Sequence, residues 1–445
     1  MTMLTHSLAV LIVIAVVFAV AKKFRVSTEL CLLLGAVGAV IAHVILPMGE
    51  DPRSALTFAE IIRHLVEGTF TYFDVCMTFL TATFFMTLYK ETGGVAFLVR
   101  AIVRKFYDHR VICLLLLMVV MMVPGAVTGS GATTVLTVGG LVGAVLTAMG
   151  VEEDKRVALV FMLAAMAAAC PPINLWAMMA AAGANMPYSG FTWPLLILCG
   201  AGAIFSTFYL AGKGEKKGTV DEVLETLEAS PEGWNMLKAF IPFVVMILLI
   251  VGARIFPAWW PTFGLPMIFM ISGFTVLLCS PKKVNVFDTA MTTVTNLKEL
   301  VGIMMVVGVL NQIMTLTGAR GLLSLAVVVL PIWLLFAALW LILPVTEGVL
   351  QYAVAPLFGV PLIMLFNMKG YNPIIALSCW AVMWPVGDCL PPTAVVGRAA
   401  VLELDYKGSY YKGFVKTALV PMLVTLAICT LAMIFNKPFG NFLGV

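Results

Sequence analysis

Long apolar runs recur along the whole chain and constrain its fold more than any other sequence feature. Many of them reach about 17–25 residues, the length at which an α-helix crosses the hydrocarbon core of a bilayer. Only 11% of the 445 residues are charged, whereas a soluble domain carries about 25%. A soluble enzyme, a disordered chain and a coiled coil are therefore excluded, and the runs lack the alternation of an outer-membrane barrel. We expect an all-α polytopic membrane protein with about 10–12 spans.

The polar composition excludes several functions. The net charge is only +4, so nucleic acid is not expected as a partner. The nine cysteines form no Cys-x-x-Cys pair and the four histidines lack ligand spacing, which argues against a disulfide framework or a zinc site. No catalytic His-Glu-x-x-His set and no ring of one charge occurs in the sequence. These absences disfavour an intramembrane enzyme and a channel and favour a transporter.

Charged residues predict the orientation and the division of the chain. Lys22, Lys23 and Arg25 follow the first apolar run, and the positive-inside rule places them in the cytoplasm with the N-terminus outside. Residues 213–235 are the longest hydrophilic stretch, with three Lys and six acidic residues, and we interpret them as a cytoplasmic linker. The linker separates a first membrane unit, residues 1–212, from a second, residues 236–445. We expect a multi-pass protein of a bacterial inner membrane.

Proline landmarks repeat between the two units. Pro171-Pro172 and Pro391-Pro392 are 220 positions apart (391 − 171), and so are Pro124 and Pro344 (344 − 124). Basic stretches in one unit correspond to uncharged stretches in the other. The pattern predicts two inverted-topology repeats built from discontinuous helices, with the transport site at the repeat interface.

A second repeated landmark predicts a pair of hairpins. The Thr92-Gly93 and Thr317-Gly318 pairs are 225 positions apart (317 − 92). Each pair lies between two apolar pieces, in residues 70–105 and 297–329. We expect re-entrant hairpins at these positions, with hydroxyl residues that pack between ordinary helices as the alternative.

Two breaks in the first unit are candidate cation sites, because non-helical backbone at membrane depth must be buried in protein or line a cavity. The first break combines Pro124 with glycines and with the hydroxyls of Thr128 and Ser130. Neutral oxygens of this kind suit Na⁺, and a packing kink of small residues is the alternative. The second break, Pro171-Pro172, removes two backbone donors and leaves carbonyl oxygens available to an ion.

Two breaks in the second unit carry ionisable residues. In the third break Glu347 follows Pro344, and in the fourth Asp388 precedes Pro391-Pro392. Because charges inside a membrane are costly, each acid could bind a coupling cation, relay protons or pair with a cation inside the protein. Arg398 is the candidate for a substrate carboxylate, since a guanidinium binds carboxylates in bidentate fashion. A structural salt bridge with either acid, or a position at the membrane interface, is the alternative.

The order of these motifs resembles a known family. The first unit reads TGSGATTVLTVGGLVGAVLTAMG and then CPPINLWAMMAAAGANMPYSGFTWP, and the second reads TEGVLQYAVAPLF and then GDCLPPTAVVG. The chain resembles the large membrane subunit of TRAP (tripartite ATP-independent periplasmic) transporters, which show similar glycine-rich and Pro-Pro breaks in this order. The resemblance implies an elevator-type ion-transporter fold that imports organic acids with Na⁺. It also implies two partners, a small four-helix membrane subunit and a periplasmic substrate-binding protein. The family residues carried over are Ser130, Gly131, Pro171, Pro172, Glu347, Gly387, Pro391 and Pro392.

The predicted function is Na⁺-coupled import of small organic anions such as C4-dicarboxylates. The protein is expected to be embedded in a lipid bilayer and to need no organic cofactor. The predicted Na⁺ site comprises Thr128, Gly129, Ser130, Gly131, Pro171, Pro172, Thr346, Glu347, Gly387, Pro391 and Pro392. The predicted substrate site comprises Asn174, Asp388, Thr393 and Arg398. Leu390 and Thr393-Ala394 depart from the TRAP pattern. They leave one alternative open, a standalone Na⁺- or H⁺-coupled carboxylate carrier that works without a binding protein.

Overall fold

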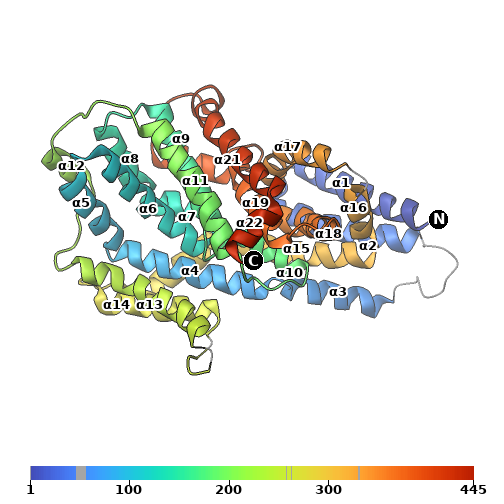
Figure 1. The fold of residues 1–445 in the computed structure, drawn as a ribbon. Helices are drawn as coiled ribbons and strands as arrows, with labels where there is room; N and C mark the ends of the chain where they lie inside the picture. Colours follow the sequence, from blue (N-terminus) through green and yellow to red (C-terminus); the bar gives the residue numbers. More distant parts are fainter. Residues whose placement is uncertain (1, 47–56, 257, 262, 329–330) are drawn as a thin grey trace.

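Ten helices among the described residues of the computed structural model are long and apolar enough to cross a membrane, and three shorter apolar helices accompany them. The structure describes residues 2–46, 57–256, 258–261, 263–328 and 331–445. Within these ranges it contains helices and turns but no strand. The prediction of an all-α polytopic membrane protein is therefore confirmed. The helices form an elongated body with the N-terminus at one end (Figure 1).

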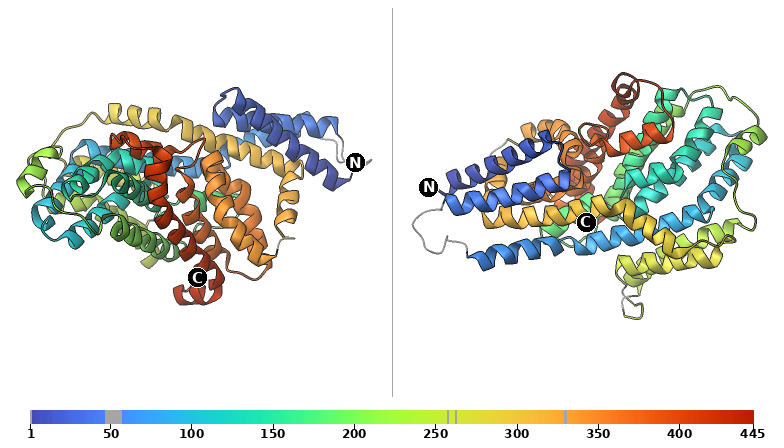
Figure 2. Two further views of the ribbon diagram at one scale, coloured as in Figure 1. Left: turned by 90° about the horizontal axis from the view of Figure 1, so that it is seen from above. Right: turned by 180° about the vertical axis from the view of Figure 1, so that it is seen from behind.

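One layer of the body consists of long helices that run side by side. Its centre is α15 (Val286–Leu316), a helix of 31 residues that packs along α2, α3 and α4 (Figure 2). Two helix pairs flank this layer: α1 packs on α2, and α13 packs on α14, which in turn contacts α4. The bounds of these helices are α1 (Met3–Lys23), α2 (Thr28–Ile45), α3 (Phe58–Phe70), α4 (Phe73–Glu91), α13 (Met236–Ile255) and α14 (Leu265–Cys279).

Each predicted hairpin position holds two helices joined by a tight turn at glycine. Gly93 (φ +83°) joins α4 to α5 (Gly94–Phe106), and Gly318 (φ +74°) joins α15 to α16 (Ala319–Val328). Only glycine adopts these left-handed angles without strain. The preceding threonine in each turn is fully buried, and its hydroxyl donates to a carbonyl one turn back in its own helix.

The remaining helices form a compact group in which several apolar runs are interrupted. In the first unit they are α6 (Arg110–Thr128), α7 (Gly131–Thr134), the π-helix η2 (Val135–Gly139), α8 (Gly140–Ala148), α9 (Glu153–Ala169), α10 (Leu175–Gly183) and α11 (Thr192–Ala211). In the second unit they are α17 (Ile332–Leu350), the short 3-10 helix η3 (Gln351–Ala353), the π-helix η4 (Ala355–Gly359), α18 (Val360–Met368), α19 (Pro373–Met383), the 3-10 helix η5 (Pro385–Gly387), α20 (Val395–Glu403), the π-helix η6 (Tyr410–Val415), α21 (Lys416–Ile434) and α22 (Asn436–Leu443). The interruptions lie where glycine and proline prevent the helical hydrogen-bond ladder from continuing.

The connector between the two units is docked on the first unit. It contains the short helix α12 (Val220–Thr226), and Arg100 donates to the carbonyls of Leu224 and Leu227 at 2.7 and 3.1 Å. Arg110 donates to the carbonyls of Met149, Ala211, Lys213 and Gly214, at the ends of α8 and α11. Because helix ends leave carbonyls without partners, one guanidinium here satisfies several of them at once.

Candidate functional site

The first and third breaks meet in the interior. Gly129 ends α6 in a left-handed conformation (φ +72°), and its carbonyl accepts a hydrogen bond of 3.2 Å from the hydroxyl of Tyr352. Tyr352 follows the end of α17, so this bond joins the two units. Gly129 has no room for a side chain, because an added Cβ would lie 2.7 Å from Leu175.

The hydroxyls of the first break are buried and partly engaged. Thr128 donates to the carbonyl of Pro124 at 2.8 Å, and its oxygen accepts from the N–H of Ser130 at 3.2 Å. The side chain of Ser130 caps α7 by accepting from the N–H of Thr133 at 3.2 Å. Gly131 begins α7 so close to α20 that an added Cβ would lie 2.8 Å from Val396. The first break is therefore packed against the helix that follows the fourth.

Glu347 is a buried acid that needs a positive partner or a proton. Its carboxylate is completely buried on α17. One oxygen, Oε2, accepts a hydrogen bond of 2.8 Å from the indole N–H of Trp176, whereas Oε1 has no partner among the described residues. The ring of Trp176 packs on that of Tyr352, with centroids 4.6 Å apart. A buried carboxylate with an unsatisfied oxygen is costly, so it favours a cation bound to that oxygen or a proton on it.

Asp388 brings a second buried acid to the same region. It is 4% exposed, and its side chain accepts from the N–H of Val395 at 3.1 Å, at the start of α20. It follows Gly387, which packs directly against Pro344 of the helix that carries Glu347, so the two acids lie in one buried region. None of the four ion pairs found in the described part of the chain includes either acid.

Small residues allow the third and fourth breaks to touch. An added Cβ on Gly387 would lie 2.0 Å from the carbonyl oxygen of Pro344, and one on Gly348 would lie 2.8 Å from Leu390. Thr393 reinforces this contact, because its backbone N–H and its hydroxyl both donate to the carbonyl of Gly348, at 3.1 and 2.8 Å. The backbone around Glu347 and the loop after Gly387 therefore form one packed unit.

The two Pro-Pro elements differ in exposure. Pro171 and Pro172 are half-buried, whereas Pro391 and Pro392 are exposed. Both pairs are joined by cis peptide bonds. Asn174 follows the first pair and is fully buried. Its side-chain amide donates to the carbonyl of Ala169 and caps the start of α10 by accepting from the N–H of Ala177, both at 2.8 Å.

Two of the predicted residues lie apart from this centre or turn away from it. Thr346 donates its hydroxyl back to the carbonyl of Ile342 in its own helix at 2.6 Å. Arg398 is exposed on α20 and donates to the carbonyl of Pro392 at 3.0 Å. Within the described residues Arg398 forms no salt bridge to Asp388 or Glu347, the structural alternative considered for it.

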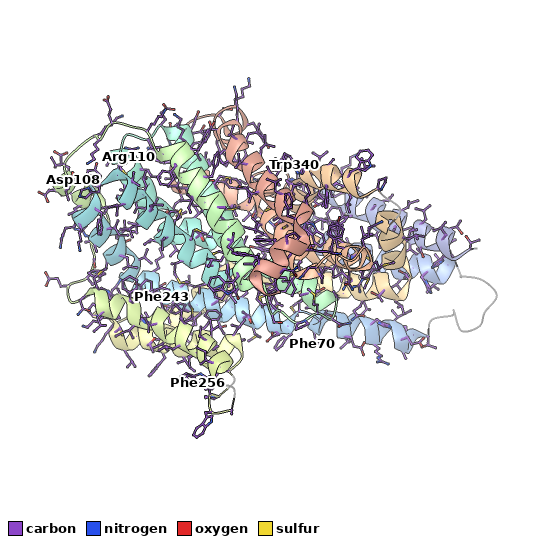
Figure 3. All side chains as sticks on the ribbon, in the orientation of Figure 1. Phe70, Asp108, Arg110, Phe243, Phe256 and Trp340 are labelled. Atoms are coloured by element: carbon purple, nitrogen blue, oxygen red, sulfur yellow. The ribbon has the colours of Figure 1, made fainter. Side chains whose placement is uncertain are left out.

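The sequence reasoning missed two aromatic residues, Trp176 and Tyr352. Each lies within six residues of a predicted break, but an indole or a phenol in an apolar run looks like ordinary packing. Their polar atoms find partners only when the two units are brought together. Figure 3 shows how densely side chains fill this region between α10, α17 and α19.

Comparisons with known proteins agree on a membrane transporter fold. Residues 4–437 match the profile of the C4-dicarboxylate anaerobic carrier (DcuC) family. The fold is similar to that of the YdaH transporter of Alcanivorax borkumensis, with a TM-score of 0.60 and 14% identity over 92% of this chain and 98% of that one. It is also similar to MtrF of Neisseria gonorrhoeae, described with a class of antimetabolite efflux pumps, with a TM-score of 0.63 and 14% identity over 91% and 94% of the two chains. No curated protein matches the chain significantly.

Proposed function

The chain belongs to the C4-dicarboxylate anaerobic carrier (DcuC) family, and on that premise we propose that it is a standalone secondary transporter of C4-dicarboxylates. It works in a bacterial inner membrane and couples the movement of its substrate to a cation held at Glu347 and Asp388. The observation that supports this most is the fully buried carboxylate of Glu347, one oxygen of which has no partner among the described residues, in the same packed region as the buried Asp388.

The family match corrects the resemblance to TRAP transporters, which is wrong. Broken helices rich in glycine and Pro-Pro elements follow from a general need to present backbone carbonyls at membrane depth. The short motifs therefore indicate a broken-helix site that several transporter families share, and they do not identify one family. The partners implied by that resemblance, a small membrane subunit and a periplasmic binding protein, have no support in a DcuC-type carrier and are not proposed.

The coupling cation is Na⁺ or a proton. The neutral oxygens of Ser130 and Thr128 and the carbonyls near both Pro-Pro pairs, the basis for expecting Na⁺, lie in breaks that pack together around Glu347 and Asp388. Two buried carboxylates near each other cannot both remain charged without a cation between them or a proton on one of them. Either cation would occupy the position beside the Glu347 oxygen that has no partner.

Matching elements support the proposal that the two membrane units, residues 1–212 and 236–445 on either side of linker 213–235, are repeats. Elements recur at the offset of 220 that separates the proline landmarks: Leu175–Gly183 corresponds to Val395–Glu403 (395 − 175). One π-helix of each unit and the helix after it recur at the same offset, Val135–Gly139 with Ala355–Gly359 and Gly140–Ala148 with Val360–Met368 (355 − 135 and 360 − 140).

Contacts between the units support an inverted relationship. The start of α9 meets the end of α20, where Tyr406 donates a hydrogen bond to Asp154. Burial and the neighbouring Asp154 raise the pKa of the Tyr406 hydroxyl. The start of α19 instead lies near the end of α10, since Met186 and Asn372 line one pocket. Helices α9 and α19 therefore begin at opposite ends of the site, as inverted repeats require. An elevator-type movement of the site across the membrane is the mechanism that we propose for this arrangement.

The substrate is proposed to bind at the exposed edge of the site, close to the fourth break. Arg398 lies there, one turn into α20, and among the described residues its guanidinium donates only to the carbonyl of Pro392. Thr393 adds a half-buried hydroxyl. Asn174 is engaged by local backbone, so we assign it to holding the start of α10 in place beside the substrate. Asp388, assigned to the cation, also fixes the start of α20 by accepting from the N–H of Val395.

Transport by the purified chain alone tests the proposal. We expect proteoliposomes that contain only this protein to exchange succinate or fumarate across the membrane. Uptake should follow an imposed Na⁺ gradient if Na⁺ couples, or a proton gradient in Na⁺-free buffer if the proton couples. Exchange that appears only after a periplasmic binding protein is added, or uptake that follows neither gradient, would refute a standalone cation-coupled carrier.

A substitution at Arg398 tests the substrate assignment. Arg398→Lys keeps the charge but loses the bidentate geometry, so we expect a raised KM for dicarboxylates in a normally folded protein. Arg25→Lys, an exposed cation on the N-terminal hairpin, is the matched control. An unchanged KM in Arg398→Lys and in Arg398→Ala would remove Arg398 from the substrate site.

A further inference from the structure

A large apolar groove lies between two parts of the molecule that are barely in contact. One wall comes from α5 and α6, and the other comes from α13 and α14. The groove has a volume of about 1290 Å³ and reaches Pro171 and Pro172 of the second break. It therefore runs beside the candidate site and shares these two prolines with it.

Besides packing on α14, α13 contacts α4 and α5 mainly through aromatic side chains. Phe243 packs on Tyr89 of α4, with ring centroids 4.9 Å apart, and Trp234, just before α13, stacks on Phe97 of α5 at 6.4 Å. Figure 3 places Phe243 where α13 approaches α4. Beyond these contacts the facing surfaces of α13 and α6 are apolar and separated. In a chain that spans a membrane, acyl chains fill such a space, because water there would leave apolar surface hydrated.

The groove is not uniformly apolar, because one end carries two cations. Arg104 and Lys105, in the last turn of α5, both line it and both are exposed. Neither belongs to an ion pair within the described parts of the chain. Their neighbour Arg100 is already committed to the carbonyls of the connector helix. Two cations without acidic partners at the mouth of an apolar groove match the chemistry of an anionic lipid headgroup.

We propose that this groove is a binding site for an anionic phospholipid. The phosphate of the headgroup lies on Arg104 and Lys105, and the acyl chains extend along α6 and α13 toward Pro171-Pro172. The lipid fills the space between α13–α14 and α5–α6. The site is independent of the identity of the transported substrate.

Native mass spectrometry of the full chain, purified with phosphatidylglycerol or phosphatidylcholine, tests the headgroup. We expect the protein to retain phosphatidylglycerol preferentially, and Arg104→Glu/Lys105→Glu to weaken its retention by at least about 30-fold, since each cation near an anionic surface contributes about fivefold. Lys23→Glu/Arg25→Glu, an equal charge change on the N-terminal hairpin, should retain it. Equal retention of the two lipids, or unchanged retention in Arg104→Glu/Lys105→Glu, would overturn the proposal.

A second pair of variants tests the acyl-chain part of the groove. Ile247 and Leu248 are neighbours on α13 and both are exposed, at 52% and 55%, but only Ile247 lines the groove. Ile247→Trp should fill the groove and displace the lipid, whereas Leu248→Trp should leave it bound. If Ile247→Trp keeps the lipid, the groove is not a lipid site. Retained lipid together with a change in oligomeric state would instead identify the groove as a contact with a second copy of the chain.

Discussion

The hydrogen bond between Trp176 and Glu347 provides the sharpest test of the candidate site. Trp176→Phe removes the indole N–H that donates to the buried carboxylate at 2.8 Å. It retains an aromatic ring that can pack on Tyr352, so the shape of the site is largely preserved. Without this donor the charged carboxylate loses a partner, and the form neutralised by a cation becomes favoured. We expect the variant to bind its coupling cation more tightly and to release it more slowly.

The size of the effect follows from the burial of the pair. A hydrogen bond to a charged group contributes about 1.5–3 kcal/mol, and more when the group cannot turn to water. Glu347 is fully buried and its other oxygen has no partner in the described structure. A change of this size corresponds to about 10- to 150-fold tighter cation binding. Tighter binding should lower the Na⁺ concentration of half-maximal uptake or, if the proton couples, raise the pH of half-maximal uptake. In either case we expect a lower maximal rate.

Radiolabelled succinate uptake into proteoliposomes measures this, titrated against Na⁺ at fixed pH and against pH without Na⁺. Trp380→Phe is the matched control, because its indole N–H is buried without a partner in the described residues. It loses the same atoms but no hydrogen bond. The reasoning fails if the cation dependence of Trp176→Phe equals that of the native protein, or if Trp380→Phe shifts it equally.

Three further predictions concern packing, the connector and topology. Gly387→Ala should lower the free energy of unfolding by at least about 1–3 kcal/mol, because its Cβ would lie 2.0 Å from the carbonyl oxygen of Pro344 in α17. The control Gly302→Ala, whose added Cβ would have nothing within 4 Å, should melt like the native protein in a thermal unfolding assay. Similar melting of both variants would contradict the close contact at Gly387. Arg110→Ala leaves the carbonyls at the ends of α8 and α11 without a donor, so limited proteolysis should cut the connector faster, with Arg110→Lys intermediate; an unchanged cutting rate would argue against the anchor. Cysteines placed at Glu152 and Lys369, both exposed, should react with an impermeant maleimide from opposite sides of the membrane, and labelling from one side would exclude inverted repeats.

The sequence predicted what depends on local chemistry. Gly93 and Gly318 mark tight turns because the backbone there needs a left-handed angle, and that requirement is visible in a Thr-Gly pair between apolar runs. Glu347 stood out because a carboxylate in an apolar run needs a partner. Spans, breaks and the acidic centre follow from such single-segment rules.

What could not be predicted depends on which segments meet. Trp176 and Tyr352 gain their roles only through contacts between the two units. Thr346, chosen for its hydroxyl, bonds to its own helix instead, as threonines in apolar helices commonly do. The family was misread for a similar reason, because glycine and proline report the backbone geometry of a break and not the ancestry of the chain around it.

The docking of the connector has a consequence for how the protein is assembled. Arg100 and Arg110 hold the connector on the first unit through side chain–carbonyl bonds, while residues 213–219 remain exposed. The covalent link in that exposed stretch therefore adds little to the packing of the two units. A polypeptide severed there should still bring its two fragments together, since the bond from Tyr352 to Gly129 and the contact from Trp176 to Glu347 join them in the interior. The chain can be regarded as two interlocking pieces.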